Sequence, residues 1–142
     1  MSVLNAAISA AASALDVEKI RIEAAVSNIA NAESTHGVDG QPYRRRDVML
    51  APAPVDSFEG ALGRATATGV KVVDVVEDRS EPRRRYDPTH PDADPDGFVA
   101  MPNVDPSQEM VDMLGAARAY QANLTAIGLI RDLLQRSLEL GR

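Results

Sequence analysis

The sequence has no cysteine and no tryptophan, and its aromatic residues are three Tyr and two Phe among 142 residues. Without cysteine the chain cannot form disulfides, bind a metal through thiolates or use a thiol nucleophile. The formal net charge is −6, so nothing favours long-range attraction to nucleic acid or to an anionic membrane. No G-x-S-x-G, P-loop, H-E-x-x-H or dinucleotide-binding glycine motif occurs. We therefore expect no enzyme, no cofactor and no nucleic-acid partner.

Charge is also missing from residues 1–15, and no Lys or Arg precedes Lys19. A cleaved secretory signal begins with a positively charged stretch, so we expect none here. The uncharged run is shorter than the roughly 18 to 20 apolar residues that span a bilayer, and it contains Ser and Asn. The sequence therefore predicts no stable membrane insertion.

Gly and Pro are absent before Gly37, and apolar residues in this stretch recur at alternating spacings of four and three. This spacing is typical of a coiled-coil seam and predicts a helix over residues 3–31. One seam position is charged. The positions are Leu4, Ile8, Ala11, Leu15, Glu18, Ile22, Ala25 and Ile29.

The carboxyl end repeats this spacing, again with one charged interruption. Asp105 and Pro106 suit an N-cap and a first helical position, and Gly141 suits a stop, so we expect a helix over residues 106–140. The matching patterns predict that the two helices pair as a coiled coil. The second seam consists of Met113, Ala117, Tyr120, Leu124, Ile127, Arg131, Leu134 and Leu138.

The middle of the chain is different in composition, because residues 32–104 hold eight of the nine Pro. Short runs of β-forming residues bounded by Gly or Pro predict strands over residues 43–50, 70–76 and 97–101. Residues 52–69 show no sustained period and predict a mobile loop.

These patterns together predict a mainly α fold with a small β-rich insert. We expect an amino-terminal helix in residues 1–31, a β-containing middle domain in residues 32–104 and a carboxyl-terminal helix in residues 105–142. The long terminal helices would pair as a coiled coil and flank the middle domain.

The apolar positions extend beyond both seams and widen each stripe. The excess surface is compatible with assembly against further helices or with a monomer whose helices fold back over the middle segment. In an antiparallel pair, the charged residues Glu18 and Arg131 either face each other and fix the register or reach solvent independently. The additional apolar positions are Val3, Val17, Val26, Leu114, Leu129, Ile130 and Leu133.

Asp92, Asp94, Asp96 and Gly97 match the opening of a calcium-binding loop, in which alternate oxygens converge on the ion. The match fails at the twelfth position, where Asn103 replaces the bidentate Glu. The segment is therefore interpreted mainly as a solvated acidic turn.

Two basic triplets, residues 44–46 and 83–85, have acidic neighbours at Asp47, Glu81 and Asp87. Alternate residues of a strand face opposite ways, so these triplets are interpreted as a solvated or interfacial face.

Three ordered segments carry longer motifs. Residues 27–35 resemble the pattern S-N-(I/L)-A-N-x-x-T, with one extra residue before Thr35, and residues 86–104 follow Y-D-P-x-H-P-x-A-D-x-x-G-(Y/F)-V-x-x-P-N-V. Residues 117–123 resemble S-R-x-Y-Q-A-N, with Ala117 in the place of Ser. Together they resemble the bacterial flagellar axial proteins, the family of rod, hook and hook-associated subunits. The motif residues of greatest interest are Asn28, Ala30, Asn31, Tyr86, Asp87, Pro88, His90, Pro91, Pro102, Asn103, Gln121 and Asn123.

The resemblance implies a structural subunit of the proximal rod of the flagellar basal body, since the chain is shorter than distal rod and hook members. Such subunits leave the cell unfolded through the flagellar type III export apparatus, without a cleaved signal peptide. They then join copies of themselves and other rod subunits in the periplasmic drive shaft that transmits torque. Their terminal helices form an inner coiled-coil layer, so both seams are expected assembly contacts. The alternative is a soluble helical adaptor or calcium-binding module.

Overall fold

The computed structural model describes residues 2–37, 40–54 and 68–140. This part of the chain is mostly helical with a small β-rich insert, as the sequence predicts, and the insert contains two small antiparallel sheets. None of its helices is both long enough and apolar enough to cross a membrane. In chain order the elements are α1 (Ser2–Ala30), β1 (Arg46–Pro54), β2 (Thr68–Glu77), β3 (Arg83–Tyr86), β4 (Phe98–Met101) and α3 (Pro106–Leu140).

Both helices begin and end within one residue of the predicted bounds. The start of α3 is fixed by Asp105, whose Oδ1 accepts a hydrogen bond from the Ser107 N–H at 2.9 Å. Pro106 follows in the first helical position, where a missing N–H costs nothing.

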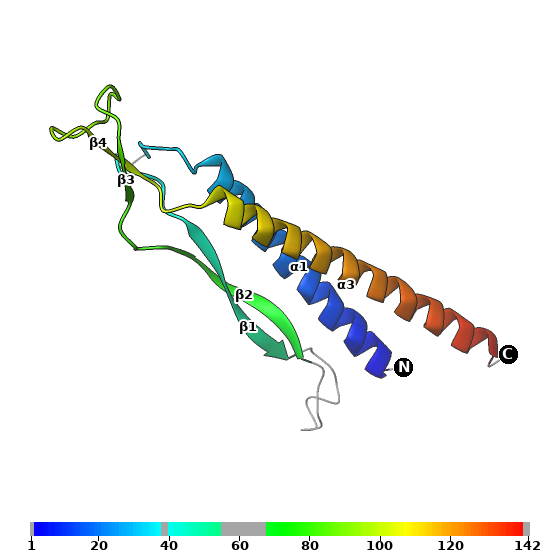
Figure 1. The fold of residues 1–142 in the computed structure, drawn as a ribbon. Coiled ribbons are helices and arrows are strands. Elements are labelled where there is room, and N and C mark those ends of the chain that lie inside the picture. Colours follow the sequence, from blue (N-terminus) through cyan, green and yellow to red (C-terminus); the bar gives the residue numbers. More distant parts are fainter. Residues whose placement is uncertain (1, 38–39, 55–67, 141–142) are drawn as a thin grey trace.

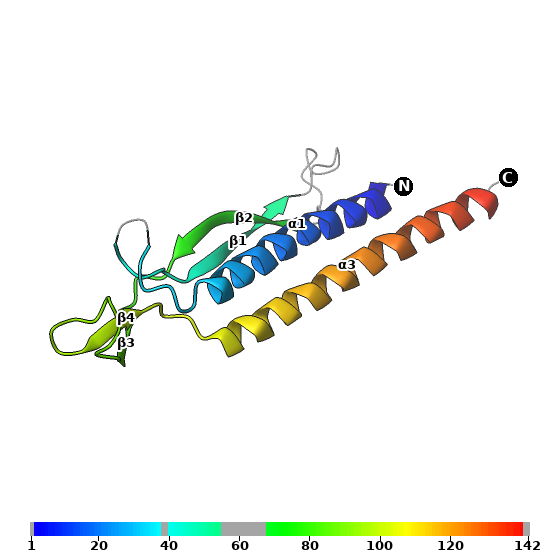
Figure 2. The same cartoon turned by 90° about the horizontal axis from the view of Figure 1, so that it is seen from above.

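The two helices run antiparallel, so the chain termini lie at the same end of the molecule (Figure 1). Seen from above, α1 lies between the β1–β2 hairpin and α3 (Figure 2). Among the described elements, α1 contacts both strands of this hairpin and α3, whereas α3 packs chiefly on α1. The β3–β4 sheet lies at the end opposite the termini. One broad side of α3 is therefore left open in a single chain.

The first sheet pairs β1 with β2 in antiparallel register, from Arg46 opposite Glu77 to Pro54 opposite Thr68. The strand predicted over residues 43–50 is thus shifted toward the carboxyl end, since the backbone N–H of Tyr43 donates to the Ser34 carbonyl at 3.4 Å and not to a strand. The loop prediction for residues 52–69 is wrong at both ends, since residues 52–54 and 68–69 belong to the strands. Strand β1 contains Pro52 and Pro54, which have no backbone N–H. An edge strand tolerates them because the N–H groups on its outer side have no strand partner. Residues 55–67 of the predicted loop lie outside the described residues.

The register of this hairpin shifts between Met49 and Leu50, which pair with Asp74 and Val72. A bulge adds one residue to β2 and reverses which side chains face inward beyond it. This irregularity explains why the Val-rich run gives no clear buried face in the sequence.

The second sheet pairs β3 with β4, from Arg83 opposite Met101 to Tyr86 opposite Phe98. Strand β4 confirms the prediction for residues 97–101. Strand β3 is missing from the sequence-based prediction because its four residues are all exposed and three are Arg, so no alternation of apolar and polar residues marks it.

The buried core consists of residues in strand β4 and in the segments that follow α1 and precede α3, and of residues where α1 packs on the first half of α3. Small and β-branched residues dominate it, as expected for a chain with few aromatic residues. Two polar residues, Asn28 and Glu109, are also buried here. The buried apolar residues are Val17, Ala25, Ala32, Val99, Met101, Val104 and Ala116.

Candidate assembly surfaces and the polar junction

Asn28 lies near the carboxyl end of α1 and is only 1% exposed. Its Nδ2 donates to Glu109 Oε2 and to the Arg46 carbonyl, both at 2.9 Å. Its Oδ1 accepts from the Tyr43 hydroxyl at 2.9 Å and from the Arg46 N–H at 2.8 Å. Burial of this amide therefore leaves none of its donors or acceptors unsatisfied. We call Asn28, Tyr43, Arg45, Arg46 and Glu109 the polar junction.

The Asn28 side chain pairs with the backbone of Arg46 much as a neighbouring strand would. It accepts from the N–H of that residue and donates to its carbonyl oxygen. Strand β1 begins at Arg46. The amide of one helical residue therefore fixes the place where the first strand meets α1.

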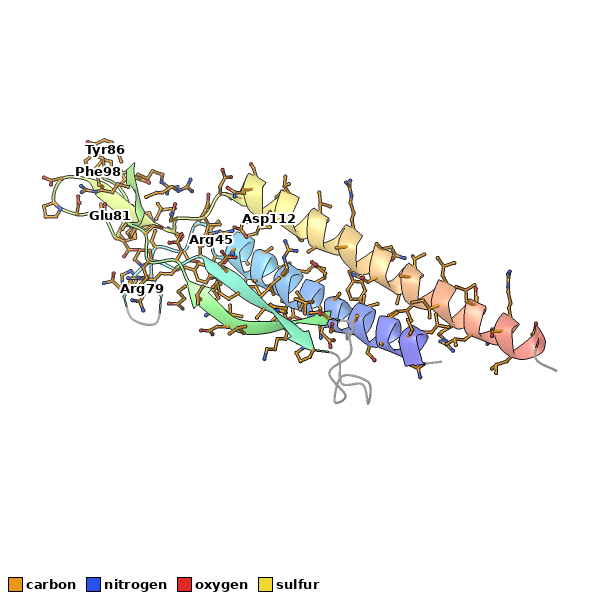
Figure 3. The ribbon with its side chains drawn as sticks, turned by 90° about the horizontal axis from the view of Figure 1, so that it is seen from below. Arg45, Arg79, Glu81, Tyr86, Phe98 and Asp112 are labelled. Atoms are coloured by element: carbon orange, nitrogen blue, oxygen red, sulfur yellow. The ribbon has the colours of Figure 1, made fainter. Side chains whose placement is uncertain are left out.

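Glu109, in the first turn of α3, is 2% exposed. Its Oε1 accepts a hydrogen bond from Arg45 Nε at 2.6 Å. The guanidinium of Arg45 also lies 3.7 Å from Asp47 and 3.9 Å from Asp112, and Figure 3 shows Arg45 near Asp112 at the start of α3. The hydrogen bond to Glu109 raises the pKa of Arg45, with partial burial opposing it and the three carboxylate charges adding to it. Because an unpaired carboxylate is costly to bury, Arg45 is what allows Glu109 to be buried.

A second contact holds the other end of the hairpin against α1. Ser13 Oγ accepts a hydrogen bond from the Val70 N–H of β2 at 3.1 Å. Ser13 precedes Asn28 by fifteen residues, about 22 Å of helix. Val70 pairs with Pro52, six residues beyond Arg46, or roughly 20 Å of strand. The distance between the Asn28 contact and the Ser13 contact is thus nearly the same along α1 as along the hairpin. The hairpin can therefore follow α1 between these two contacts.

Of the two seams, Ala25 is buried in a single chain at 4% exposure, whereas the large apolar seam residues are all at least partly exposed. Leu124 and Leu138 are the most accessible, at 47% and 63% exposure. The role of these residues in assembly stays a prediction. The remaining nine, all half-buried, are Leu4, Ile8, Leu15, Ile22, Ile29, Met113, Tyr120, Ile127 and Leu134.

Large apolar side chains beyond the seam are also exposed, most of all along α3. Leu129 and Leu133, which lie one turn apart on α3, are 61% and 57% exposed. Val17, by contrast, is buried. Exposed apolar side chains that recur along one helix mark a candidate interaction surface. The exposed large apolar residues of α3 are Met110, Val111, Leu114, Leu124, Leu129, Leu133 and Leu138.

The suggested pairing of Glu18 with Arg131 is wrong. Glu18 instead accepts a hydrogen bond from Arg21 of its own helix at 3.0 Å. In the observed antiparallel register, in which Asn28 meets Glu109, Glu18 and Arg131 are twelve residues out of step, about 18 Å along the helix axis. The spacing of residues within one seam does not determine how far one helix is shifted along the other, so the sequence could not reveal this offset.

The connection between β3 and β4 is closed by Asp94 and Gly97. Asp94 Oδ1 accepts from the backbone N–H of Phe98 at 2.8 Å and of Asp96 at 3.0 Å, and its Oδ2 accepts from Arg84 at 2.6 Å. The Phe98 N–H, the Arg84 guanidinium and the Asp96 N–H together lower the pKa of Asp94, against the opposing effect of desolvation. Gly97 adopts a positive φ of 79°, which a residue with a side chain adopts only with strain.

An aromatic pair covers this turn, and Tyr86 is 65% exposed whereas Phe98 is half-buried. The rings of Tyr86 and Phe98 meet edge to face with centroids 5.3 Å apart. The Arg84 guanidinium lies 4.7 Å from the Phe98 ring centroid. Figure 3 places both rings at the end of the molecule opposite the termini.

Asp92 ties the same turn to the segment that follows α1. Its Oδ2 accepts from the Thr35 hydroxyl at 2.7 Å, and its Oδ1 lies 3.2 Å from His36 Nδ1. The hydrogen bond from Thr35 is the main cause of a lowered pKa at Asp92. The carboxylates of Asp92 and Asp94 are thus engaged in closing the turn, and the described residues contain no group of three His, Cys, Asp or Glu side chains placed to hold a metal ion.

The other motif residues make mainly local contacts. The Asp87 carboxylate accepts from the Thr89 hydroxyl, which is the main cause of a lowered Asp87 pKa, and His90 Nδ1 accepts from the Asp92 N–H at 3.1 Å. Asn103 Nδ2 donates to Ser80 Oγ at 2.6 Å, and Pro102 is fully buried.

Two motif amides, Asn31 and Asn123, donate to carbonyls four residues earlier in the chain, at 2.8 and 3.0 Å. They support their own helix and do not join it to another element. The remaining motif residues are exposed, and these are Ala30, Tyr86, Pro88, Pro91 and Gln121.

Three important residues, Ser13, Arg45 and Glu109, were not singled out from the sequence. An acidic residue in the first turn of a helix is ordinarily explained by the helix dipole, which hides the burial of Glu109. Arg45 sits inside a basic triplet that resembles a solvated face. Burial of both groups depends on contacts between segments more than sixty residues apart. No local signal in the sequence reports such contacts.

The fold defines an elongated, mainly helical structural protein, with two long antiparallel helices and a small β segment between them. Residues 96–140 match the family model described as the flagellar basal body rod FlgEFG protein C-terminal. The flagellar basal-body rod protein FlgC of Salmonella typhimurium is 41% identical over 132 residues, 93% of each chain. The Bacillus subtilis protein of the same name is 40% identical over 145 residues, covering 95% of this chain and 96% of the relative.

The protein of this name from Yersinia enterocolitica is 39% identical over 142 residues and covers all of both chains. The chain therefore belongs to the FlgC family of flagellar basal-body rod proteins, and it is a structural subunit of that rod. The resemblance read from the three sequence motifs is confirmed. The alternative of an adaptor or calcium-binding module finds no support among these relatives.

Proposed function

We propose that this rod subunit polymerises through the apolar faces of α1 and α3, with copies of itself and with other rod subunits. The rod so formed would be the proximal part of the torque-transmitting drive shaft in the periplasm. Long helices packed side by side in many copies supply the stiffness that torque requires. This role needs no catalysis and no cofactor.

The observation that carries the proposal is the uncovered side of α3. The hairpin and α3 flank α1, whereas α3 packs chiefly on α1 and keeps seven large apolar side chains exposed. Burial of apolar surface releases about 25 cal/mol per Å², so further helices laid against this face would be held there strongly. The positions of these side chains, along most of a 35-residue helix, suit long parallel contacts between subunits.

The proposed layers follow the predicted domains. Residues 1–31 and 105–142 would form the inner layer, where the helices pair as a coiled coil with one another and with neighbours. Residues 32–104 would form the outer layer. The polar junction lies where the two layers meet and would hold them together.

We further propose that the chain reaches the rod through the flagellar type III export apparatus, without a cleaved signal. A narrow export channel requires an unfolded chain. The absence of cysteine suits repeated unfolding and refolding, because no disulfide has to be broken or formed.

The test is to replace Leu129 and Leu133 with Asp. Both side chains are exposed in the free subunit, so its folding should be preserved, with unchanged circular dichroism. At a subunit interface each would bury an uncompensated charge, so we expect no assembled rod and no motility. Gln135→Asp, an exposed position on the same helix, is the control and should assemble normally. Motile cells that carry the double variant would contradict the proposal.

A further inference from the structure

The seams of α1 and α3 do not by themselves define one alignment of the two helices. Ile8, Leu15, Ile22 and Ile29 are spaced by seven residues, and so are Met113, Tyr120, Ile127 and Leu134. Sliding one helix by seven residues, about 10 Å, therefore places a large apolar residue where another lay before. Apolar packing distinguishes such alignments weakly, because the hydrophobic effect is not directional.

The polar junction distinguishes them strongly. Asn28 and Glu109 are 1% and 2% exposed, and they meet at 2.9 Å in the observed alignment. A slide of seven residues would bring Asn28 level with Ala116 in one direction and with Pro102 in the other. Neither side chain can accept a hydrogen bond, so the buried amide would lose its partner on α3.

The same residues also tie the alignment to the hairpin. Asn28 binds both backbone groups of Arg46, and Glu109 binds the side chain of Arg45. Neighbouring residues at the start of β1 thus contact α1 and α3 at once. A slide of α3 would separate Glu109 from Arg45 and leave a buried carboxylate without its positive partner.

We propose that the polar junction is a register lock, which selects one of several alignments of α1 and α3 related by seven residues. All five of its hydrogen bonds join residues of one chain, so the lock can form in a single subunit. It thereby decides which apolar side chains of the two helices stand level with each other. In so far as the role in polymerisation holds, the lock also determines the surface that a subunit presents to its neighbours.

The test uses two spin labels and the free, full-length chain. The chain has no cysteine, so Glu23→Cys and Arg131→Cys give unique attachment sites, both exposed. In the observed alignment these positions are offset by seventeen residues, about 26 Å along the axis. A slide of seven residues changes this offset by about 10 Å, which pulsed electron paramagnetic resonance resolves. We expect a single distance in the labelled but otherwise unchanged chain.

Glu109→Leu removes the lock on α3 and keeps the bonds from Asn28 to Arg46. We expect a second distance displaced by about 10 Å. Glu109→Gln retains one oxygen acceptor, which can still accept from Asn28 although the bond from Arg45 is lost, and it should keep the single distance. Asn123→Leu is the matched control, since Asn123 bonds only within its own helix among the described contacts, and it should also keep the single distance.

A single, unshifted distance in Glu109→Leu would overturn the proposal. So would a featureless distribution in Glu109→Leu, because that result would assign Glu109 to holding the helices together and not to choosing their alignment. The measurement is made on unassembled chains, so its failure is separate from a failure of the polymerisation proposal.

Discussion

Gly97 shows how a single residue controls local structure in this protein. A Cβ at this position would stand 2.9 Å from Tyr86 Cε2 and 3.2 Å from Pro88 Cβ, and the backbone already has φ of 79°. The family motif thus requires glycine for two separate reasons, backbone conformation and close approach of the aromatic ring. Asn28 is the second such residue, because its side-chain amide forms hydrogen bonds with Tyr43, Arg46 and Glu109.

Gly97→Ala should destabilise the chain. The left-handed backbone costs a residue with a side chain about 1–2 kcal/mol, and displacement of Tyr86 and Pro88 adds to this loss. Gly40→Ala is a matched control, with φ of 70° and nothing within 4 Å of the added atom, so it should show the backbone cost alone. Urea unfolding of both variants measures the difference. Equal losses would show that the ring moves aside freely.

Asp94 gives the chain a predictable response to acid. Its pKa is lowered from the ordinary value of 3.8, so it stabilises the folded chain fully above that pH. The contribution is lost as the pH falls through the lower pKa of the folded state. Asp94→Asn should therefore reduce the loss of stability between about pH 5 and pH 2. Urea midpoints across this range measure it, with Asp132→Asn on the exposed face of α3 as control; an unchanged acid response would refute the assignment.

At the level of elements, α3 is stabilised on one side by packing against α1. On its other sides it depends on the helix propensity of its own residues. Gly115 and Gly128 lie within it, and nothing stands within 4 Å of a Cβ built at either position. Helices of this length rely on tertiary packing for most of their stability, and exposed glycines weaken them further. The open face of α3 is thus also the part of the fold with least support.

Gly115→Ala and Gly128→Ala should each stabilise the free chain. The expected gain is about 0.8–1.0 kcal/mol per substitution, the difference in helix propensity between the two residue types. Thermal unfolding followed by far-ultraviolet circular dichroism is the measurement. A loss of stability at either site would mean that the space above it is filled in the free chain. Gly97→Ala, which has the opposite expected sign, serves as the internal comparison.

At the level of the whole molecule, packing is uneven along the helix pair. The fully buried residues of α1 are Val17, Ala25 and Asn28, and those of α3 are Glu109 and Ala116. All of them lie toward the polar junction, and among the described residues of the two helices none nearer to the chain termini is fully buried. The two helices are thus tightly packed at the end near the polar junction and loosely packed at the end near the chain termini.

Hydrogen exchange of the free subunit should follow this gradient. Amides in residues 17–28 and 109–116 should be protected at least about tenfold more than those in residues 4–10 and 130–138, which corresponds to about 1.4 kcal/mol of opening free energy. Protection of the latter segments should rise in the assembled rod, because neighbours cover them there. Uniform protection in the free chain would contradict both expectations.

The helices and the family were predictable from the sequence because both are local properties. Periodic apolar residues, Asp105 and Pro106 define α3 without reference to the rest of the chain, and ordered motifs define the family. Strand β3 escaped prediction because exposed Arg residues carry no period. The bulge in β2 escaped it because a register shift depends on the partner strand.

The sequence alone determined that this protein has two long helices with apolar seams around a small β segment, and that it belongs among flagellar axial proteins. Period, capping and motif order act over a few residues, so they can be read along the chain. The tertiary structure alone decided that α3 is aligned on α1 by Asn28 and Glu109, residues 81 positions apart, and not by Glu18 and Arg131. Alignment is a relation between distant segments, fixed by directional hydrogen bonds, and repeating apolar seams are compatible with several alignments.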